Sequence, residues 1–121
     1  MGADPRSAGA QHRRRLGRAG EAAAASFLER LGYRVIGAGF LARRGELDLI
    51  CRHGERLVLV EVKTRSSAAL GAPAEAVDAR KRRALGAAAA EYRALAGWQG
   101  PIEFAVVSVQ GDELELIEDP F

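Results

Sequence analysis

The sequence predicts an α/β domain, in which helices and strands alternate along a chain of 121 residues. Two observations lead to this fold class. Apolar residues recur at helical spacing in two segments, and five shorter segments are rich in the apolar residues typical of strands. In chain order these segments give a helix, three strands, a second helix and two further strands. Because a chain of this length builds one hydrophobic core, we expect a single domain.

The composition is that of an ordinary globular protein, with 48% hydrophobic and 28% charged residues. No stretch approaches the roughly 18 consecutive apolar residues of a membrane helix, and the N-terminus lacks the apolar segment of a signal peptide. Cys51 is the one cysteine, which excludes an internal disulfide, and His12 and His53 lie too far apart to suggest a zinc-ligand cluster. We therefore expect a cytoplasmic protein without a membrane partner.

Positive charge is concentrated near the N-terminus. Residues 1–18 hold five arginines against one aspartate, a charge of +4, whereas the whole chain carries +2, so the other 103 residues sum to −2. We predict a disordered basic tail over 1–12, rich in small residues, and a single domain over 13–121. The tail is either a solubilising N-terminus or an arm that binds phosphate. Since the domain is not basic in bulk, nucleic-acid affinity must come from local patches.

The first helix is predicted from about Arg14 to Leu31, with Gly32 as its stop signal. Glu21 falls at the edge of the apolar stripe of this helix rather than opposite it. Residues 33–36 are expected to form a short strand, followed by a loose segment of glycine and alanine.

The next two strands are predicted over 46–52 and 57–64, joined as a hairpin across three residues. Both faces of the second strand are apolar, which indicates a central strand covered on both sides. Because side chains alternate along a strand, Glu61 and Lys63 share the face that carries Leu59.

Asp78 is a good N-cap for a long Ala-rich helix that runs to about Leu95, although Pro73 could start the helix earlier. The predicted inward stripe of this helix begins at Lys81, one of only two lysines in a chain with 16 arginines, and ends at Leu95. Residues 102–109 and 114–118 are predicted to close the chain as two strands joined by a glycine-containing turn.

Asp48 and Glu61 are carboxylates placed inside apolar strands. Burying a charge is costly unless the charge is paired or bound to a metal. Mg²⁺ prefers oxygen ligands and usually takes one or two carboxylates. We therefore predict that Asp48 and Glu61 bind Mg²⁺ or Mn²⁺, with the backbone carbonyl of Val62 as a third ligand. Such a cation polarises a phosphate and lowers the pKa of an attacking water, so this pattern favours phosphodiester hydrolysis.

Lys63 completes the candidate catalytic set, because an ammonium is a compact charge with a tunable pKa that arginine cannot replace. It could orient the attacking water or stabilise developing charge. Each residue also has a structural interpretation. Glu61 and Lys63 could form an ordinary ion pair on a half-exposed face, residues 45–48 could be a turn into an edge strand, and Glu21 could be in a surface ion pair.

Four spaced blocks of the sequence form a recognisable set. They are Gly17-x-x-Gly20-Glu21, Gly45-Glu46-Leu47-Asp48-Leu49-Ile50, Val60-Glu61-Val62-Lys63-Thr64-Arg65, and Gly71-x-Pro73-x-Glu75-Ala76-Val77 with Lys81 after it. Together they resemble the YraN family of small bacterial proteins, over roughly residues 17–109. The sequence departs from that family at Gly39, where Asn is expected, and at 103–105, where Glu-Phe-Ala replaces Arg-Phe-Asp. These departures bear on substrate contacts or structural pairing.

The YraN family is in turn similar to the restriction-endonuclease-like superfamily, which includes Holliday-junction resolvases. The resemblance implies a restriction-endonuclease-like core, a mixed β-sheet flanked by the two helices. It implies that Asp48, Glu61 and Lys63 bind metal and drive cleavage, that Glu21 joins them, and that Lys81 lies near the scissile phosphate.

The leading hypothesis is thus a Mg²⁺- or Mn²⁺-dependent nuclease acting on DNA in preference to RNA, with branched or structured DNA among its substrates. Two alternatives stay open: a nucleic-acid-binding module with little turnover, and a structural partner subunit. Phosphate contacts are predicted for Arg43, Arg44, Arg65, Arg80, Arg82 and Arg83, with further arginines at 13–15.

We also expect a homodimer, because paired cleavage of a duplex needs two sites related by a twofold axis. The apolar segment 114–117 could pair across such an axis or finish its own sheet.

Overall fold

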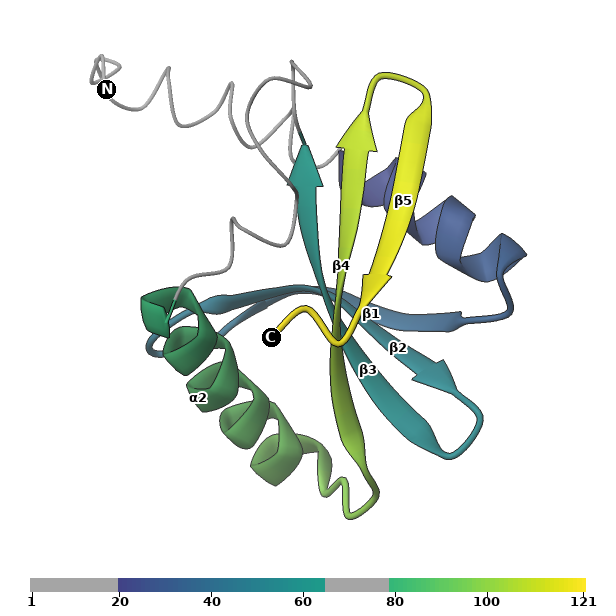
Figure 1. The fold of residues 1–121 in the computed structure, drawn as a ribbon. Helices are drawn as coiled ribbons and strands as arrows, with labels where there is room; N and C mark the ends of the chain where they lie inside the picture. Colours follow the sequence, from purple (N-terminus) through teal and green to yellow (C-terminus); the bar gives the residue numbers. More distant parts are fainter. Residues whose placement is uncertain (1–19, 65–78) are drawn as a thin grey trace, which may run out of the picture.

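The computed structural model describes residues 20–64 and 79–121 of the chain (Figure 1). Several predictions lie outside the described residues. They are the disordered tail over 1–12, the start of the domain at residue 13, the beginning of the first helix, the arginines at 13–15, Arg65 and the N-cap at Asp78.

Five strands form one mixed sheet whose spatial order follows the chain, β1-β2-β3-β4-β5 (Figure 1). The strands are β1 (Arg34–Leu41), β2 (Glu46–His53), β3 (Arg56–Thr64), β4 (Ile102–Gln110) and β5 (Glu113–Glu118). All neighbours are antiparallel except β3 and β4, which are parallel. A parallel pair requires a crossover connection, and the crossover contains α2 (Ala79–Ala96). The predicted element order is confirmed.

A helix covers each face of the sheet (Figure 1). The first helix, described over 20–30, contributes Leu28 to a core cluster that contains Val60 of β3. On the other face Leu85 of α2 belongs to a second cluster, with Leu59 of β3. Residues 57–61 of β3 are all buried, which confirms the prediction of a central strand covered on both sides. No helix within 20–64 and 79–121 has the length and apolarity needed to span a membrane.

Gly32 ends the first helix, as predicted. It has a φ of 96°, which glycine adopts without a steric penalty. The Tyr33 amide donates to the Leu28 carbonyl at 3.0 Å, and the Gly32 amide donates to the Glu29 carbonyl at 3.1 Å. These two bonds form a Schellman motif, which satisfies the last carbonyls of the helix and starts the chain towards β1.

The β1 strand is longer than predicted. It continues through residues 37–39, which we expected to be a loose segment, and reaches Leu41. Its register shifts between Val35, which pairs with Cys51, and Gly37, which pairs with Ile50, so one extra residue is accommodated as a β-bulge. Because the bulge restores pairing, the glycine-containing segment stays in the sheet.

The inward stripe of α2 is shorter than predicted, since Leu95 is 73% exposed. At 3.6 residues per turn, Leu95 lies about 80° around the helix from Leu85, which is beyond the buried face. The last inward contact of the predicted stripe is Tyr92, whose ring meets that of Phe40 edge-on at 5.3 Å.

The last two strands turn at Gly111, which has a φ of 59°. Leu114 and Leu116 of β5 pack against the first core cluster, and β5 pairs with β4 over six residue pairs. The segment 114–117 therefore finishes its own sheet. The homodimer itself stays a prediction.

Strands β2 and β3 pair over only part of their length. Their ladder begins at His53 and Arg56, next to the turn, and its last pair is Leu49 with Val60. Beyond that pair β2 continues against β1, and β3 continues against β4. The two strands therefore separate, and we call the opening between residues 46–48 of β2 and 61–64 of β3 the strand fork.

Candidate active site at the strand fork

Asp48 and Glu61 occupy the first positions of the strand fork. Continuing the ladder by one step beyond Leu49 and Val60 would place them opposite each other, so their side chains share one face. Glu61 is buried and Asp48 is half-buried. The Glu61 carboxyl acts on Asp48 through its charge and through a side-chain hydrogen bond. The structure thus brings the two predicted metal ligands together.

The Val62 backbone faces the same opening. Its amide nitrogen donates a hydrogen bond to Asp48 Oδ2 at 2.8 Å. In a strand, the N–H and C=O of one residue point to the same edge, so the Val62 carbonyl also faces the fork. This direction fits the prediction that the Val62 carbonyl is available as a ligand.

Glu21 and Glu46 add two more carboxylates. One ligand oxygen each from Glu21, Glu46 and Asp48 lies within 4.8 Å of the other two. Glu46 was not among the predicted site residues. The signal was present in the sequence, because Glu46 and Asp48 are two residues apart on one strand and alternate residues share a face.

Gly20 explains how the first helix brings Glu21 to the fork. A Cβ at Gly20 would clash with the Thr64 side-chain hydroxyl and would lie 3.8 Å from Val62 Cγ1. Glycine therefore lets the helix approach the end of β3 without displacing the Thr64 side chain. The position of Glu21 depends on this contact.

Lys81 reaches the fork from α2. Its Nζ lies 3.0 Å from Glu61 Oε1. Burial lowers the pKa of Lys81, but the hydrogen bond and charge of Glu61, with the charges of Asp48 and Glu46, outweigh burial and raise it. Lys81 is therefore an ammonium. The turn before β2 lies close to α2, since a Cβ at Gly45 would be only 3.2 Å from the Ala84 carbonyl oxygen of that helix.

Several carboxylates are crowded together at the fork. Burial and, after it, the charges of Glu61 and Glu21 together raise the pKa of Asp48 to about 7, against the hydrogen bond from the Val62 amide, which lowers it. Crowded carboxylates favour a bound proton unless nearby positive charge offsets their repulsion, and a divalent cation would add positive charge to that of the Lys81 ammonium. The donors are all hard oxygen atoms, which is the ligand set that Mg²⁺ and Mn²⁺ prefer. The residues present therefore fit a divalent cation.

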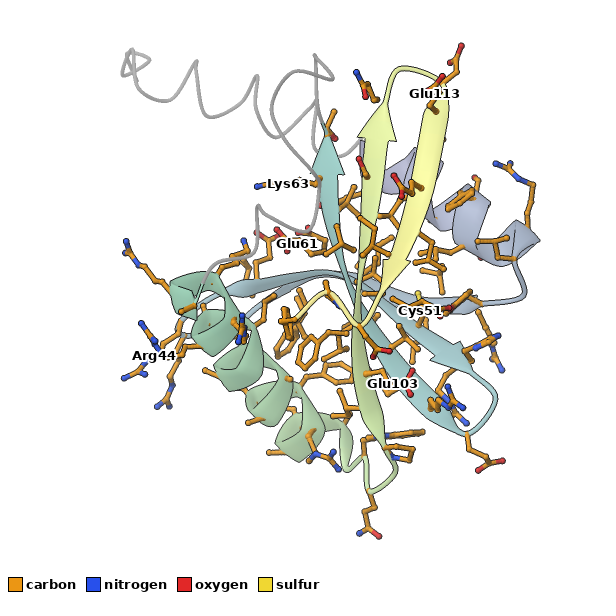
Figure 2. All side chains as sticks on the ribbon, in the orientation of Figure 1. Arg44, Cys51, Glu61, Lys63, Glu103 and Glu113 are labelled. Carbon is orange, nitrogen blue, oxygen red and sulfur yellow. The ribbon has the colours of Figure 1, made fainter. Side chains whose placement is uncertain are left out.

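Lys63 lies two residues beyond Glu61 on β3 and is half-buried. Figure 2 shows the two side chains projecting to the same side of the strand, as the alternation predicted. Lys63 thus lies at the outer rim of the fork, whereas Glu61 lies inside it.

Five of the predicted phosphate-binding arginines are exposed beside α2, and Figure 2 shows Arg44 next to that helix. The Arg43 amide donates to Glu91 Oε2 at 3.0 Å, which fixes the turn before β2 to α2. We call this group the basic surface; its members are Arg43, Arg44, Arg80, Arg82 and Arg83.

A separate pocket of about 110 Å³ lies at the turn end of the hairpin, away from the fork. Its polar groups bond to one another. The Tyr33 hydroxyl donates to Glu118 Oε1 at 3.1 Å, and Arg56 Nη1 lies 3.2 Å from Glu103 Oε1. This pocket joins β3, β4 and β5 and is not a second candidate site.

The two departures from the YraN pattern have structural explanations. Glu103 forms the ion pair with Arg56 at the turn end of the hairpin, and Ala105 is buried in the first core cluster. Gly39 has a φ of 66°, a conformation that glycine and asparagine both tolerate better than other residues. None of these three residues is among those that form the fork.

The sequence matches the uncharacterised protein family UPF0102 over residues 20–109. A UPF0102 protein of Moorella thermoacetica is 43% identical over 106 residues, covering 87% of this chain and 88% of the relative. Relatives from Symbiobacterium thermophilum and Anaeromyxobacter dehalogenans are 49% and 46% identical over 98 residues each. Both alignments cover 80% of this chain, and they cover 83% and 73% of the respective relatives. The chain belongs to the UPF0102 family, which confirms the resemblance to the YraN proteins.

Proposed function

We propose that this UPF0102 protein is a divalent-cation-dependent nuclease, which hydrolyses phosphodiester bonds in DNA and has branched or structured DNA among its candidate substrates. The observation that carries the proposal is the strand fork. Asp48 and Glu61 are the first residues beyond the last pair of the β2–β3 ladder, and the Val62 carbonyl faces the same opening. Ordinary strand pairing does not require two carboxylates at that point, whereas a cation site does.

Asp48, Glu61 and the Val62 carbonyl would hold Mg²⁺ or Mn²⁺, and Glu21 and Glu46 would bind its waters or complete its ligands. When bound, the cation would polarise the phosphate and generate the nucleophilic water. The role of Lys63 at the rim is to orient that water or to stabilise the charge that develops on the phosphate.

The basic surface supplies contacts to the phosphate backbone next to the fork. Exposed guanidinium groups suit this task, because each can pair with phosphate oxygens through two N–H donors. These contacts carry no sequence information by themselves, so the proposed enzyme recognises the shape of its substrate. Paired cuts in a duplex would require a second copy of the chain.

One observation favours a second candidate function, a nucleic-acid-binding module with little turnover. The ammonium of Lys81 lies 3.0 Å from Glu61 Oε1 and so neutralises one of the two central carboxylates. If that ion pair is permanent, the fork is a structural charge network, and the basic surface still binds nucleic acid.

The deciding experiment incubates the purified chain with labelled linear, nicked, flapped and four-way-junction DNAs and with RNA, in Mg²⁺ or Mn²⁺. The Asp48→Ala variant is compared with Asp112→Ala, which removes an exposed carboxylate at the β4–β5 turn. If the protein is a nuclease, wild type and Asp112→Ala should cleave DNA, whereas Asp48→Ala should not. Binding without cleavage in all three favours the binding module, and the absence of both overturns both functions.

A further inference from the structure

The ion pair between Lys81 and Glu61 is unequal. The side chain of Glu61 is 8% exposed, whereas that of Lys81 is 41% exposed. Glu61 lies on the central strand and cannot leave the fork without disrupting the sheet. Lys81 has a flexible four-carbon stem on the first part of α2, so its ammonium can move into solvent while the helix stays in place.

Lys81 compensates several carboxylates at once. Its ammonium interacts with Glu61 and lies within the electrostatic reach of Asp48 and Glu46. A buried carboxylate that loses its partner is strongly destabilising, so Glu61 requires a positive charge beside it. A lysine ammonium and a divalent cation satisfy the same requirement.

The choice of lysine is informative in a chain with 16 arginines and two lysines. Arginine would pair with Glu61 through two parallel hydrogen bonds in a fixed planar geometry. An ammonium is a compact point charge that makes a less directional contact. Lysine therefore gives a positive charge that can be exchanged, whereas arginine would occupy the carboxylate more permanently.

We propose that Lys81 is an exchangeable counter-ion of the fork, which pairs with Glu61 in the cation-free protein and is displaced when a divalent cation binds there. The displaced ammonium joins the adjacent basic surface and becomes available to a substrate phosphate. Cation binding thereby increases the affinity for nucleic acid. This inference rests on the proposed cation site. It assigns to Lys81 a role that couples the binding of the cation to the binding of nucleic acid.

The first test is calorimetric titration of the full chain with Mn²⁺. Lys81→Met removes the competing charge, so it should bind Mn²⁺ roughly tenfold more tightly than wild type. Lys81→Arg should bind it more weakly than wild type. The matched control is Arg83→Met, which removes an exposed positive charge from the same helix and should change the affinity by less than about twofold.

The order of affinities separates the outcomes. If wild type binds Mn²⁺ and Lys81→Met binds it equally or more weakly, Lys81 does not compete, and the counter-ion inference is wrong while the proposed cation site stands. If neither wild type nor either Lys81 variant binds Mn²⁺, the proposed nuclease function fails together with the inference. Tighter Mn²⁺ binding by Lys81→Met than by wild type, with the weakest binding by Lys81→Arg, supports both the proposed cation site and the counter-ion inference.

A second readout uses thermal unfolding and does not depend on activity. Without cation, Lys81→Met should have a lower Tm than wild type, because Glu61 loses its partner. Saturating Mn²⁺ should narrow or reverse that difference, since a bound cation replaces the ammonium and stabilises the folded state by mass action. A purely structural Lys81 would leave the same Tm difference with and without Mn²⁺. If Lys81→Met does not fold, Lys81→Arg is used instead: because it retains the charge and competes more strongly, Mn²⁺ should raise its Tm by less than it raises the Tm of wild type, and an equal rise would contradict the inference.

Discussion

Asp48 accepts a hydrogen bond from the Val62 amide at 2.8 Å, across the point where β2 and β3 stop pairing. The side chain thus replaces the backbone carbonyl that a continuing ladder would have supplied. This bond satisfies the Val62 amide and links β3 to β2 at the point where their ladder has ended. The fork is therefore maintained by one of the carboxylates that we propose as metal ligands, which links the local fold to the proposed chemistry.

The double role of Asp48 can be separated by substitution. Asp48→Asn keeps an oxygen that can accept from Val62 but loses the charge, so near pH 4, where the folded Asp48 is protonated, it should be about as stable as wild type, and it should lose Mn²⁺ binding. Asp48→Ala leaves the Val62 amide without its acceptor and should cost about 1–3 kcal/mol of stability. Urea unfolding and Mn²⁺ calorimetry measure the two effects. Equal stabilities of the Asn and Ala variants would show that the hydrogen bond does not support the fork.

The raised pKa of Asp48, about 7, predicts an unusual dependence of stability on pH in the absence of metal. The unfolded aspartate has an ordinary pKa near 3.8, so between about pH 4 and pH 7 the folded state binds the proton more tightly. Stability falls with increasing pH wherever the folded state binds more protons. The contribution of Asp48 should therefore decline across this window and level off above pH 7.

The measurement is the free energy of unfolding of wild type and Asp48→Asn from pH 4 to pH 8. The difference between the two proteins should change across the window, with the Asn variant gaining relative stability as pH rises. Asp112→Asn, at an exposed turn, is the control and should track wild type. A constant difference between wild type and Asp48→Asn would contradict the assigned pKa.

How much of this site was accessible from sequence depends on the range of the interactions. Alternation along β3 placed Glu61 and Lys63 on one side, and helical spacing turned Lys81 inward, since both are local periodicities. The approach of the first helix to Thr64 depends on tertiary contact, and so does the bulge in β1. Strand alternation places Glu46 on the same face as Asp48, but the prediction rested on carboxylates inside apolar runs, and Glu46 precedes the run that begins at Leu47.

Lys63→Arg should abolish cleavage while Mn²⁺ binding and folding remain close to wild type. The substitution keeps the positive charge at the rim but removes the compact donor with a tunable pKa. Single-turnover cleavage measures the first effect, and calorimetry with Mn²⁺ measures the second. Activity within a few-fold of wild type would mean that Lys63 contributes only its charge.

Gly20→Ala should destabilise the protein by about 1–3 kcal/mol, the usual cost of forcing an extra methyl into a close contact. The new Cβ would clash with the Thr64 hydroxyl, displace the first helix and move Glu21 away from Asp48. The control is Gly86→Ala on α2, where nothing lies within 4 Å of the added Cβ. That change should stabilise the helix by about 0.5–1 kcal/mol.

A double substitution distinguishes the clash from an effect on helix propensity. Thr64→Ala removes the opposing hydroxyl, so Gly20→Ala combined with Thr64→Ala should regain part of the stability that Gly20→Ala loses. Strictly additive losses in urea unfolding would indicate that the two residues do not meet, and the first helix would then approach β3 for another reason.

The basic surface should make nucleic-acid binding steeply dependent on salt. Each phosphate contact contributes roughly 0.9 to the slope of log affinity against log salt concentration for duplex DNA. Arg82→Gln and Arg83→Gln should each reduce that slope by up to this amount, whereas Arg30→Gln, exposed on the first helix, should leave it unchanged. Fluorescence anisotropy with a labelled duplex between 50 and 200 mM salt would give the slopes, a range over which several phosphate contacts produce a large change.

Deleting residues 1–15 tests the N-terminal arginines in the same assay. These residues lie outside the described part of the chain, and their sequence carries four of the five arginines found before residue 19. If they bind phosphate, the deletion should flatten the salt slope by more than any single substitution and leave the cleavage of bound substrate unchanged. An unchanged slope would assign the segment to solubility. A loss of cleavage at saturating protein would instead place the segment in the site, contrary to our expectation that the fork contains the chemistry.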